Sequence, residues 1–226
     1  MVGDAGVQRA ARPRPAASIL ALWQDSKGVP HIFMGRRHAS LKFMPGFLVF
    51  PGGRVEPRDR LDETKDRLTA ACARVLDAEV AGIAGSSFAQ AALRECLEET
   101  GLALAGHLDG SLIYIARAIT PPHLPIRYDT RFFLAKVKAT EVPPMPTGSG
   151  DGELLQPGWF AAPSLADQPL HHVTQAVLNH GLQEDVTEQS RLLVADRRPK
   201  RWKGLPPLRS RDLRAAQTKN DTATGP

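Results

Sequence analysis

The chain has no long hydrophobic run and few aromatic side chains, and each shortage narrows the class of protein. No apolar stretch approaches the roughly 20 residues that a membrane-spanning helix needs, so we expect no membrane association. Aromatic residues make up 6% of the 226 residues, whereas 42% are hydrophobic and 23% are charged, which is typical of a globular protein. Length and composition therefore predict one domain with a sizeable core, together with an extension or two.

Cysteine is equally scarce. Cys72 and Cys96 are too far apart for a Cys-X-X-Cys pair, and both fall in helix-like sequence. This usage favours reduced, partly buried thiols in a cytoplasmic protein. The short apolar stretch near the N-terminus leads into Gln24 and Asp25, which favours a strand over a secretory signal, and Asp4 disfavours a transit peptide.

Acidic residues are scarce in one segment of the chain, near the C-terminus. The net charge is +5, but residues 197–214 hold eight basic residues against one acidic residue, Asp212. Without these seven net positive charges the rest of the chain carries −2. A solvated basic tail is the favoured interpretation, and a nucleic-acid footprint is the alternative.

Apolar patterning predicts strands interleaved with helices, and therefore an α+β domain with a mixed sheet. Pro51, Gly52 and Gly53 should end the third strand, because proline lacks an amide donor and glycine accepts unusual backbone angles. The strands are expected at 17–23, 31–37, 46–53, 111–120 and 130–139, with a short one after 154.

The helices follow from composition and capping signals. The alanine-rich stretch 60–86 has apolar residues near helical spacing and predicts an added helix. A second helix should begin with a capping box, with Ser87 at the N-cap and Gln90 three residues on, and should end at Gly101. Further expectations are helices from Pro163 and over 171–181, a flexible N-terminus over 1–15, a domain over 16–195 and an irregular basic tail over 196–226.

Three glutamates of the second helix share one face. At about 100° per residue, Glu98 and Glu99 flank Glu95 within an arc of about 100°. Arg94 is the only nearby cation, and anions crowded at a helix C-terminus repel one another and oppose the macrodipole. A divalent cation would reverse this cost, so the pattern favours a Mg²⁺-type oxygen site over a solvated acidic face. The other side of the helix, expected to face the core, holds Ala89, Leu93, Cys96 and Leu97.

Residues 94–102, Arg-Glu-Cys-Leu-Glu-Glu-Thr-Gly-Leu, resemble the second half of the Nudix box at every fixed position. In the first half Gly53 matches the opening glycine, and Asp59 stands where that box has a glutamate. The family usually allows seven residues before the arginine, whereas here there are 34, over 60–93. We interpret the two segments as halves of one site with a helical insertion between them, which costs little closure entropy. The resemblance covers roughly residues 17–185 and implies an α/β/α sandwich.

The resemblance also implies an activity. Nudix hydrolases cleave the diphosphate of a nucleoside diphosphate linked to another group, with Mg²⁺ or Mn²⁺ as cofactor. It implies that Glu98 and Glu99 bind the metal with the carbonyl of Gly52, and that Glu95 is a ligand or the general base. Arg94 would orient the carboxylates through salt bridges. Some members place the base on a later loop, where the candidates left open are Glu141, Asp151 and Glu153.

A segment upstream resembles the Nudix branch that cleaves coenzyme A or acyl-CoA to 3′,5′-ADP and (acyl-)4′-phosphopantetheine. Arg37, Lys42, Gly46 and the Phe-Pro-Gly-Gly run at 50–53 keep its spacing, although His38 replaces a serine and Lys42 an arginine. Coenzyme A carries a 3′-phosphate, so its site needs cations. The candidate substrate-binding residues are Arg37, Lys42, Gly53 and Arg127, with Arg36 as a further cation.

Other functions stay open. ADP-ribose, NADH or capped RNA are alternative substrates, and the basic tail mildly favours RNA. A non-catalytic nucleotide sensor is disfavoured, because the box carboxylates are all present. The expected partner is therefore a small-molecule nucleotide, and whether the chain forms a homodimer is left open. We interpret His171 and His172 as the start of a helix, and Trp159 and Phe160 as core anchors, with base stacking as the alternative.

Overall fold

A computed structural model describes residues 11–60, 67–80, 82–138, 145–148, 150–187 and 190–194, the last stretch mainly by its backbone. The whole predicted tail, 196–226, and Glu141 lie outside these residues. The strands are β1 (Arg14–Gln24), β2 (Pro30–Arg37), β3 (Leu48–Val49), β4 (Gly52–Arg54), β5 (Ile113–Ile119), β6 (Tyr128–Lys136), β7 (Leu154–Ala161) and β8 (Leu192–Val194). The helices are α1 (Ala70–Glu79), α2 (Gly85–Thr100) and α3 (His172–Gly181), with 3-10 turns η1 (Pro57–Arg60), η3 (Leu104–His107) and η4 (Ala162–Asp167).

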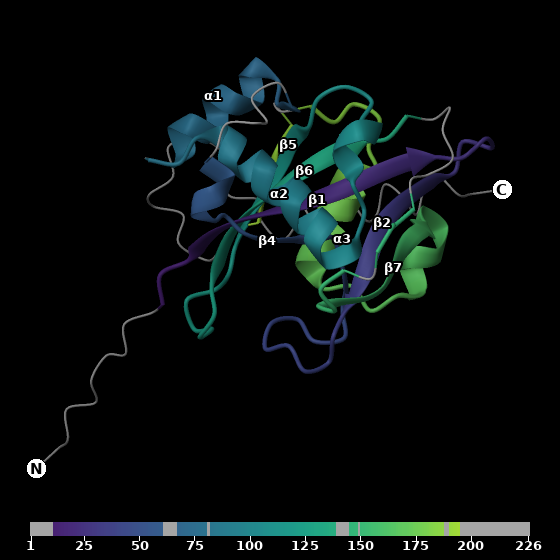
Figure 1. Cartoon of the computed structure of the whole chain (residues 1–226), viewed down its shortest axis with the longest axis horizontal. Helices are drawn as coiled ribbons and strands as arrows, with labels where there is room; N and C mark the ends of the chain where they lie inside the picture. The colour runs from purple at the N-terminus through teal and green to yellow at the C-terminus, as the bar shows by residue number, and fades with distance from the viewer. Residues whose placement is uncertain are drawn as a thin grey trace, which may run out of the picture.

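The strands form one mixed sheet in the order β3-β2-β1-β6-β5-β8, with β4 paired to β1 and β7 to β2. Figure 1 shows β1 between β6 and β2. β1 runs parallel to β6 along its length and is antiparallel to its other neighbours. On that other side, β4 pairs with the first half of β1, at Ala16 to Ser18, and β2 with the second half, at Leu22 to Gln24. On this side of β1 the pairing strand therefore changes from β4 to β2 along its length. The α+β mixed sheet expected from the sequence is confirmed.

Helices cover both faces of the sheet. Ala17, Ile19 and Ala21 of β1 lie in a buried cluster with side chains of α1 and α2, whereas Leu20 lies in a second cluster with side chains of α3. Because β1 is apolar on both faces, it can be buried in the middle of three layers. Each fully buried large aliphatic or aromatic side chain contributes about 1.5–3 kcal/mol. None of the described helices is long and apolar enough to cross a membrane.

The predicted third strand, 46–53, is two short strands. β3 pairs with β2 and β4 pairs with β1, so the chain changes partner between them. The Pro51 carbonyl accepts hydrogen bonds from the Ile19 amide at 3.0 Å and the Ser18 hydroxyl at 2.9 Å, which fixes the crossing. The N-terminal strand also begins earlier than expected, so that Arg14 and Pro15 of the predicted flexible N-terminus pair with β6.

The capping box predicted at Ser87 is wrong. α2 begins at Gly85 after the N-cap Ala84, which makes no side-chain capping bond. The exposed first amide is instead bound by α1, because Asp77 accepts a hydrogen bond from the Gly85 amide at 2.6 Å. A Cβ on Gly85 would lie 2.8 Å from the Leu76 Cβ, so only glycine allows this close approach of the two helices.

The other helix predictions fare differently. α1 lies within the stretch 60–86 where a helix was expected. α2 ends as predicted, because Gly101 has a φ of 73° and its amide donates to the Leu97 carbonyl. The helix expected from Pro163 is the 3-10 turn η4, whereas α3 over His172–Gly181 is confirmed. His171 caps α3 through its ring, as the interpretation of a helix start requires.

Candidate active site

The C-terminal half of α2 presents its three glutamates to β4 and to the loops around it. The exposed fraction of the side chain is 3% for Glu99, 15% for Glu95 and 37% for Glu98. The acidic arc is therefore turned partly inward. Leu97, which was expected to face the core, is 47% exposed, so that part of the prediction is wrong.

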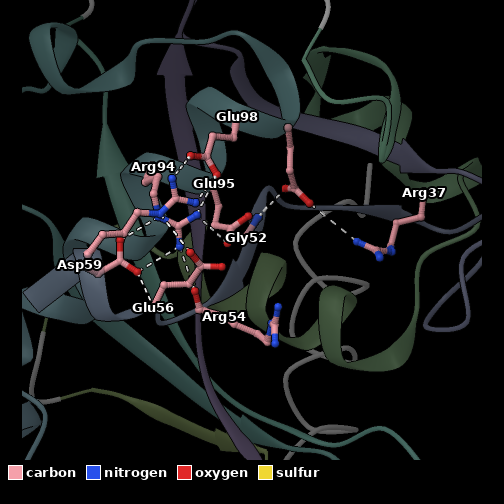
Figure 2. A network of polar contacts seen from close by, with 10 residues as sticks. Arg37, Gly52, Arg54, Glu56, Asp59, Arg94, Glu95 and Glu98 are labelled. Carbon is pink, nitrogen blue, oxygen red and sulfur yellow. Dashed lines mark hydrogen bonds and ion pairs between the residues drawn. The ribbon is translucent and has the colours of Figure 1, made fainter.

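Arg94 is the centre of the polar network (Figure 2). Its Nη1 atom donates to Glu95 at 2.9 Å and to Glu98 at 2.8 Å, and its Nη2 atom donates to the Arg54 carbonyl at 2.9 Å. Burial disfavours the charge, but the hydrogen bond that Arg94 donates to Asp59 and the neighbouring carboxylates outweigh it and hold the pKa of Arg94 above its usual range. This guanidinium therefore fixes the side chains of two of the three glutamates.

Asp59, which departs from the usual box residue, is part of this network. Its two carboxylate oxygens accept from Arg94 Nε at 2.7 Å and Nη2 at 3.0 Å, and one also accepts from the Glu56 amide at 2.7 Å. Asp59 is 2% exposed, so the pair is a buried bidentate one. The shorter acid thus reaches the arginine from η1 and ties the first half of the box to α2.

Glu99 is the most buried acid of the three. It accepts a hydrogen bond from the Gly52 amide at 2.8 Å, and Arg37 Nη1 lies 3.8 Å from its other oxygen. Burial raises the pKa of Glu99 to about 8, and these two contacts only partly oppose that shift. Burial also raises the pKa of Glu95, against the effect of Arg94. Burial thus favours the protonated form of Glu99 in the metal-free protein, and a bound cation would favour the carboxylate.

The double glycine leaves room for these carboxylates. A Cβ on Gly53 would lie 2.4 Å from the Glu95 carboxyl carbon. A Cβ on Gly52 would lie 2.4 Å from the Ala17 carbonyl oxygen of β1. Any side chain here would push either the strand or the acid away, so the glycines set the distance between β4 and α2.

Arg37 and the loop before β7 close the other end of the site. Arg37 donates from Nε to the Phe43 carbonyl at 3.0 Å and pairs with Glu153 at 3.4 Å, besides its contact with Glu99. The Asp151 amide donates to the Glu98 carbonyl at 2.9 Å, which satisfies a free carbonyl at the end of α2. Of the two described loop acids, Glu153 is thus the one whose carboxylate is linked to the cluster.

The remaining predicted residues are not joined to the cluster by any contact among the described residues. Lys42 is exposed on the loop after β2. Arg127 donates to the backbone carbonyls of Thr120 at 2.9 Å and Ala11 at 2.7 Å. Arg36 donates to the carbonyl of Gly46 and the side chain of Gln168. Trp159 packs against Phe33 and Trp23, as expected of a core anchor.

Two charged residues of the site, Glu56 and Arg58, were not singled out from the sequence. Arg58 of η1 pairs with Glu98 at 3.1 Å and with Glu56 at 3.0 Å. The signal was the short run Val-Glu-Pro-Arg-Asp at 55–59, in which acids and a base follow the glycines at turn spacing. Without the fold, nothing assigned these charges to the helix 40 residues on.

The donor set suits a hard divalent cation, although it is not arranged as a finished cluster. No three His, Cys, Asp or Glu side chains within the described ranges meet closely enough to form a metal group. Arg94 occupies one oxygen each of Glu95 and Glu98. Glu99 and Glu95 nevertheless offer neighbouring carboxylate oxygens, which are the ligands that Mg²⁺ or Mn²⁺ prefers. Glu95, Glu98 and Glu99 would therefore hold the ion, with the Gly52 carbonyl as a further candidate.

An acidic helix face, locked by an arginine and set against a double glycine in an α/β/α sandwich, defines a class of phosphoanhydride hydrolases. A family model described as NUDIX domain matches residues 12–180, and the chain belongs to this family. It is a Nudix hydrolase that acts on nucleoside diphosphate-linked substrates.

Two solved structures illustrate the likeness. A NUDIX hydrolase from Alicyclobacillus acidocaldarius is 25% identical with a TM-score of 0.60, over 76% of this chain and 92% of that chain. The NUDIX domain of Shewanella oneidensis NrtR, complexed with ADP ribose, is 11% identical with a TM-score of 0.50, over 79% of this chain and 91% of that one. At that identity the second likeness concerns the fold alone. No curated protein matches the chain.

Proposed function

We propose that this chain is a Mg²⁺- or Mn²⁺-dependent diphosphatase that cleaves coenzyme A or acyl-CoA to 3′,5′-ADP and (acyl-)4′-phosphopantetheine. Water adds its oxygen to one phosphorus of the anhydride, the bridging P–O bond breaks, and two phosphate monoesters leave. A bound divalent cation would lower the pKa of that water and neutralise charge on the leaving phosphate. Glu95, Glu98 and Glu99 would hold it, and Arg94 would keep these side chains in position.

The single observation that carries the substrate proposal is the position of Arg37. This residue begins the coenzyme A-type segment, and its guanidinium lies 3.8 Å from Glu99 and 3.4 Å from Glu153. A cation at the edge of the carboxylate cluster can bind a phosphate oxygen while the cluster binds a metal. Lys42 and Arg127 have no such link and contribute only if the substrate reaches them.

The test is a substrate panel with the full chain. Coenzyme A, acetyl-CoA, ADP-ribose, NADH and capped RNA are incubated with Mg²⁺ or Mn²⁺, and the products are separated by chromatography. We expect 3′,5′-ADP from coenzyme A at the highest kcat/KM, and no product when the metal is chelated. Equal or better turnover of ADP-ribose or capped RNA would overturn the substrate proposal and leave the hydrolase class intact.

The general base is proposed to be Glu95 or Glu153. Glu95 is partly buried next to the glycine pair, and Glu153 is linked to the cluster through Arg37. Removal of the true base should lower kcat by about 10²–10⁴-fold. Comparing Glu95→Gln with Glu153→Gln at saturating metal therefore separates the two, and similar losses in both variants would exclude a single base.

We further propose that the stretch 60–86, which contains α1, is an insertion between the two halves of the box, within a domain over 16–195. A cytoplasmic location belongs to the same proposal. It is supported by two free, buried cysteines, because reduced thiols are typical of that compartment.

A further inference from the structure

A basic hollow adjoins the carboxylate cluster on the side of β4. It has a volume of about 330 Å³ and lies between the start of β1, the end of β4 and the turn that follows. The backbone carbonyl of Arg54 accepts the hydrogen bond from Arg94, so the hollow begins where the catalytic network ends. Its lining residues are Arg14, Pro15, Arg54, Val55, Glu56 and Pro57.

The pairing of the strands brings two arginines to the same face of the sheet. Arg54 of β4 is directly opposite Ala16 of β1, and Arg14 lies two residues before Ala16. Residues two apart on a strand point to the same face, so Arg14 and Arg54 are diagonal neighbours within reach of each other's long side chains. Like charges in this arrangement are unfavourable, unless an anion lies between them.

The surroundings do not neutralise these charges. Within the described ranges, neither guanidinium takes part in a hydrogen bond or ion pair. The one acid of the lining, Glu56, is paired with Arg58 at 3.0 Å. Figure 2 shows the Arg54 side chain extending away from Arg94 and Asp59, and therefore away from the acids of the cluster. The hollow thus carries positive charge that the described acids do not pair, and the backbone carbonyl of Arg54 connects it to the catalytic network.

An aromatic pair lies next to this charge. Tyr128 of β6 is directly opposite Arg14 in the parallel pairing with β1, so the two side chains share a face. Phe43, from the loop after β2, packs edge to face on Tyr128 with ring centroids 5.1 Å apart. Aromatic faces beside guanidinium groups suit a nucleoside that carries a phosphate, since the ring can stack while the phosphate pairs.

We propose that Arg14 and Arg54 form a subsite for a phosphate monoester on the substrate's nucleoside, separate from the diphosphate that is cleaved. This subsite selects nucleotides that carry an additional ribose phosphate over those that lack it. The inference rests on the proposed function, because it assigns a substrate class to the same site. It moves the recognition of that phosphate from Lys42 and Arg127 to two residues that the sequence did not single out.

The test measures binding by the full chain with metal chelated, so that no hydrolysis is needed. The probes are adenosine 3′,5′-bisphosphate, adenosine 2′,5′-bisphosphate, AMP and inorganic phosphate, titrated by calorimetry. Wild type should bind one bisphosphate about tenfold or more tighter than AMP, because each charge-assisted contact is strong. Arg14→Ala and Arg54→Ala should each remove most of that preference. Lys27→Ala, which removes an exposed cation in the turn at the other end of β1, should keep it.

Each other outcome has a definite meaning. Equal binding of bisphosphate and AMP by wild type, or an unchanged preference in both arginine variants, would overturn the inference. Loss of the preference in Lys27→Ala as well would mean that the preference comes from overall charge, and this too would overturn the inference. Inorganic phosphate binding as tightly as the bisphosphate would exclude a nucleotide subsite. If the preference holds but neither coenzyme A nor acetyl-CoA is hydrolysed in the substrate panel with Mg²⁺ or Mn²⁺, the subsite stands and the proposed function fails.

Discussion

Replacing Glu99 by glutamine should stabilise the metal-free protein near neutral pH and abolish its stabilisation by Mg²⁺. Glutamine keeps the acceptor for the Gly52 amide, which lies 2.8 Å from the present carboxylate, and removes the buried ionisable group. Burial raises the pKa of Glu99 from 4.5 to about 8. The folded protein therefore holds a proton that the unfolded chain releases between these two values, and wild-type stability falls as the pH rises through that window.

The magnitude follows from the same values. Between the ordinary pKa of 4.5 and neutral pH, at about 1.4 kcal/mol per pH unit, the contribution is at most about 3 kcal/mol. Urea unfolding of wild type and Glu99→Gln in EDTA, at about pH 5 and about pH 7, measures it. The variant should gain little at the lower pH and up to about 3 kcal/mol at the higher one. Glu184→Gln, at an exposed position, is the control for losing a carboxylate.

Two results would refute this reasoning. One is a Glu99→Gln variant that is less stable than wild type by the same amount at both pH values, which would mean that Glu99 is ionised and well paired when folded. The other is an unchanged Mg²⁺-dependent rise in Tm in the variant, which would place the metal elsewhere.

Three further predictions test the parts that hold the site together. Asp59→Asn should lower kcat about 10- to 100-fold with little change in overall fold, because Arg94 loses its bidentate partner. In the same steady-state assay Asp59→Glu, which keeps a carboxylate, should retain more of the wild-type kcat than Asp59→Asn. Gly53→Ala should abolish turnover, because its Cβ would lie 2.4 Å from the Glu95 carboxyl carbon, whereas Gly106→Ala, with open space around it, should be active. Asp77→Ala should lower the free energy of unfolding by about 1 kcal/mol in urea, because the Gly85 amide loses its acceptor; no loss would contradict the capping role.

Local signals in the sequence predicted the elements that local chemistry decides. Gly101 ends α2 because a left-handed residue is needed there, and glycine adopts that conformation without strain. The apolar stretch at 17–23 predicted a strand, and both core clusters contain side chains of β1. The acidic arc of α2 could be read from helical spacing alone.

Contacts between distant segments could not be read in this way. The start of α2 was misplaced because its first amide is bound by Asp77 of another helix, whereas Ser87 offered a plausible local cap. Helical spacing gave the relative angles of Glu99 and Leu97 but not which of them the neighbouring strand and loop would cover. The role of Asp59 depended on Arg94, which lies 35 residues later in the chain, after α1.

The most direct test of the central claim compares the metal-dependent hydrolysis of coenzyme A and ADP-ribose by wild type and by Glu99→Gln. If α2 gathers carboxylates to hold a cation over a phosphoanhydride, wild type should release nucleotide product only with Mg²⁺ or Mn²⁺. Loss of a ligand worth several kcal/mol should then lower kcat/KM of the variant about 10²-fold or more. Turnover by the folded variant within a few-fold of wild type would contradict the account.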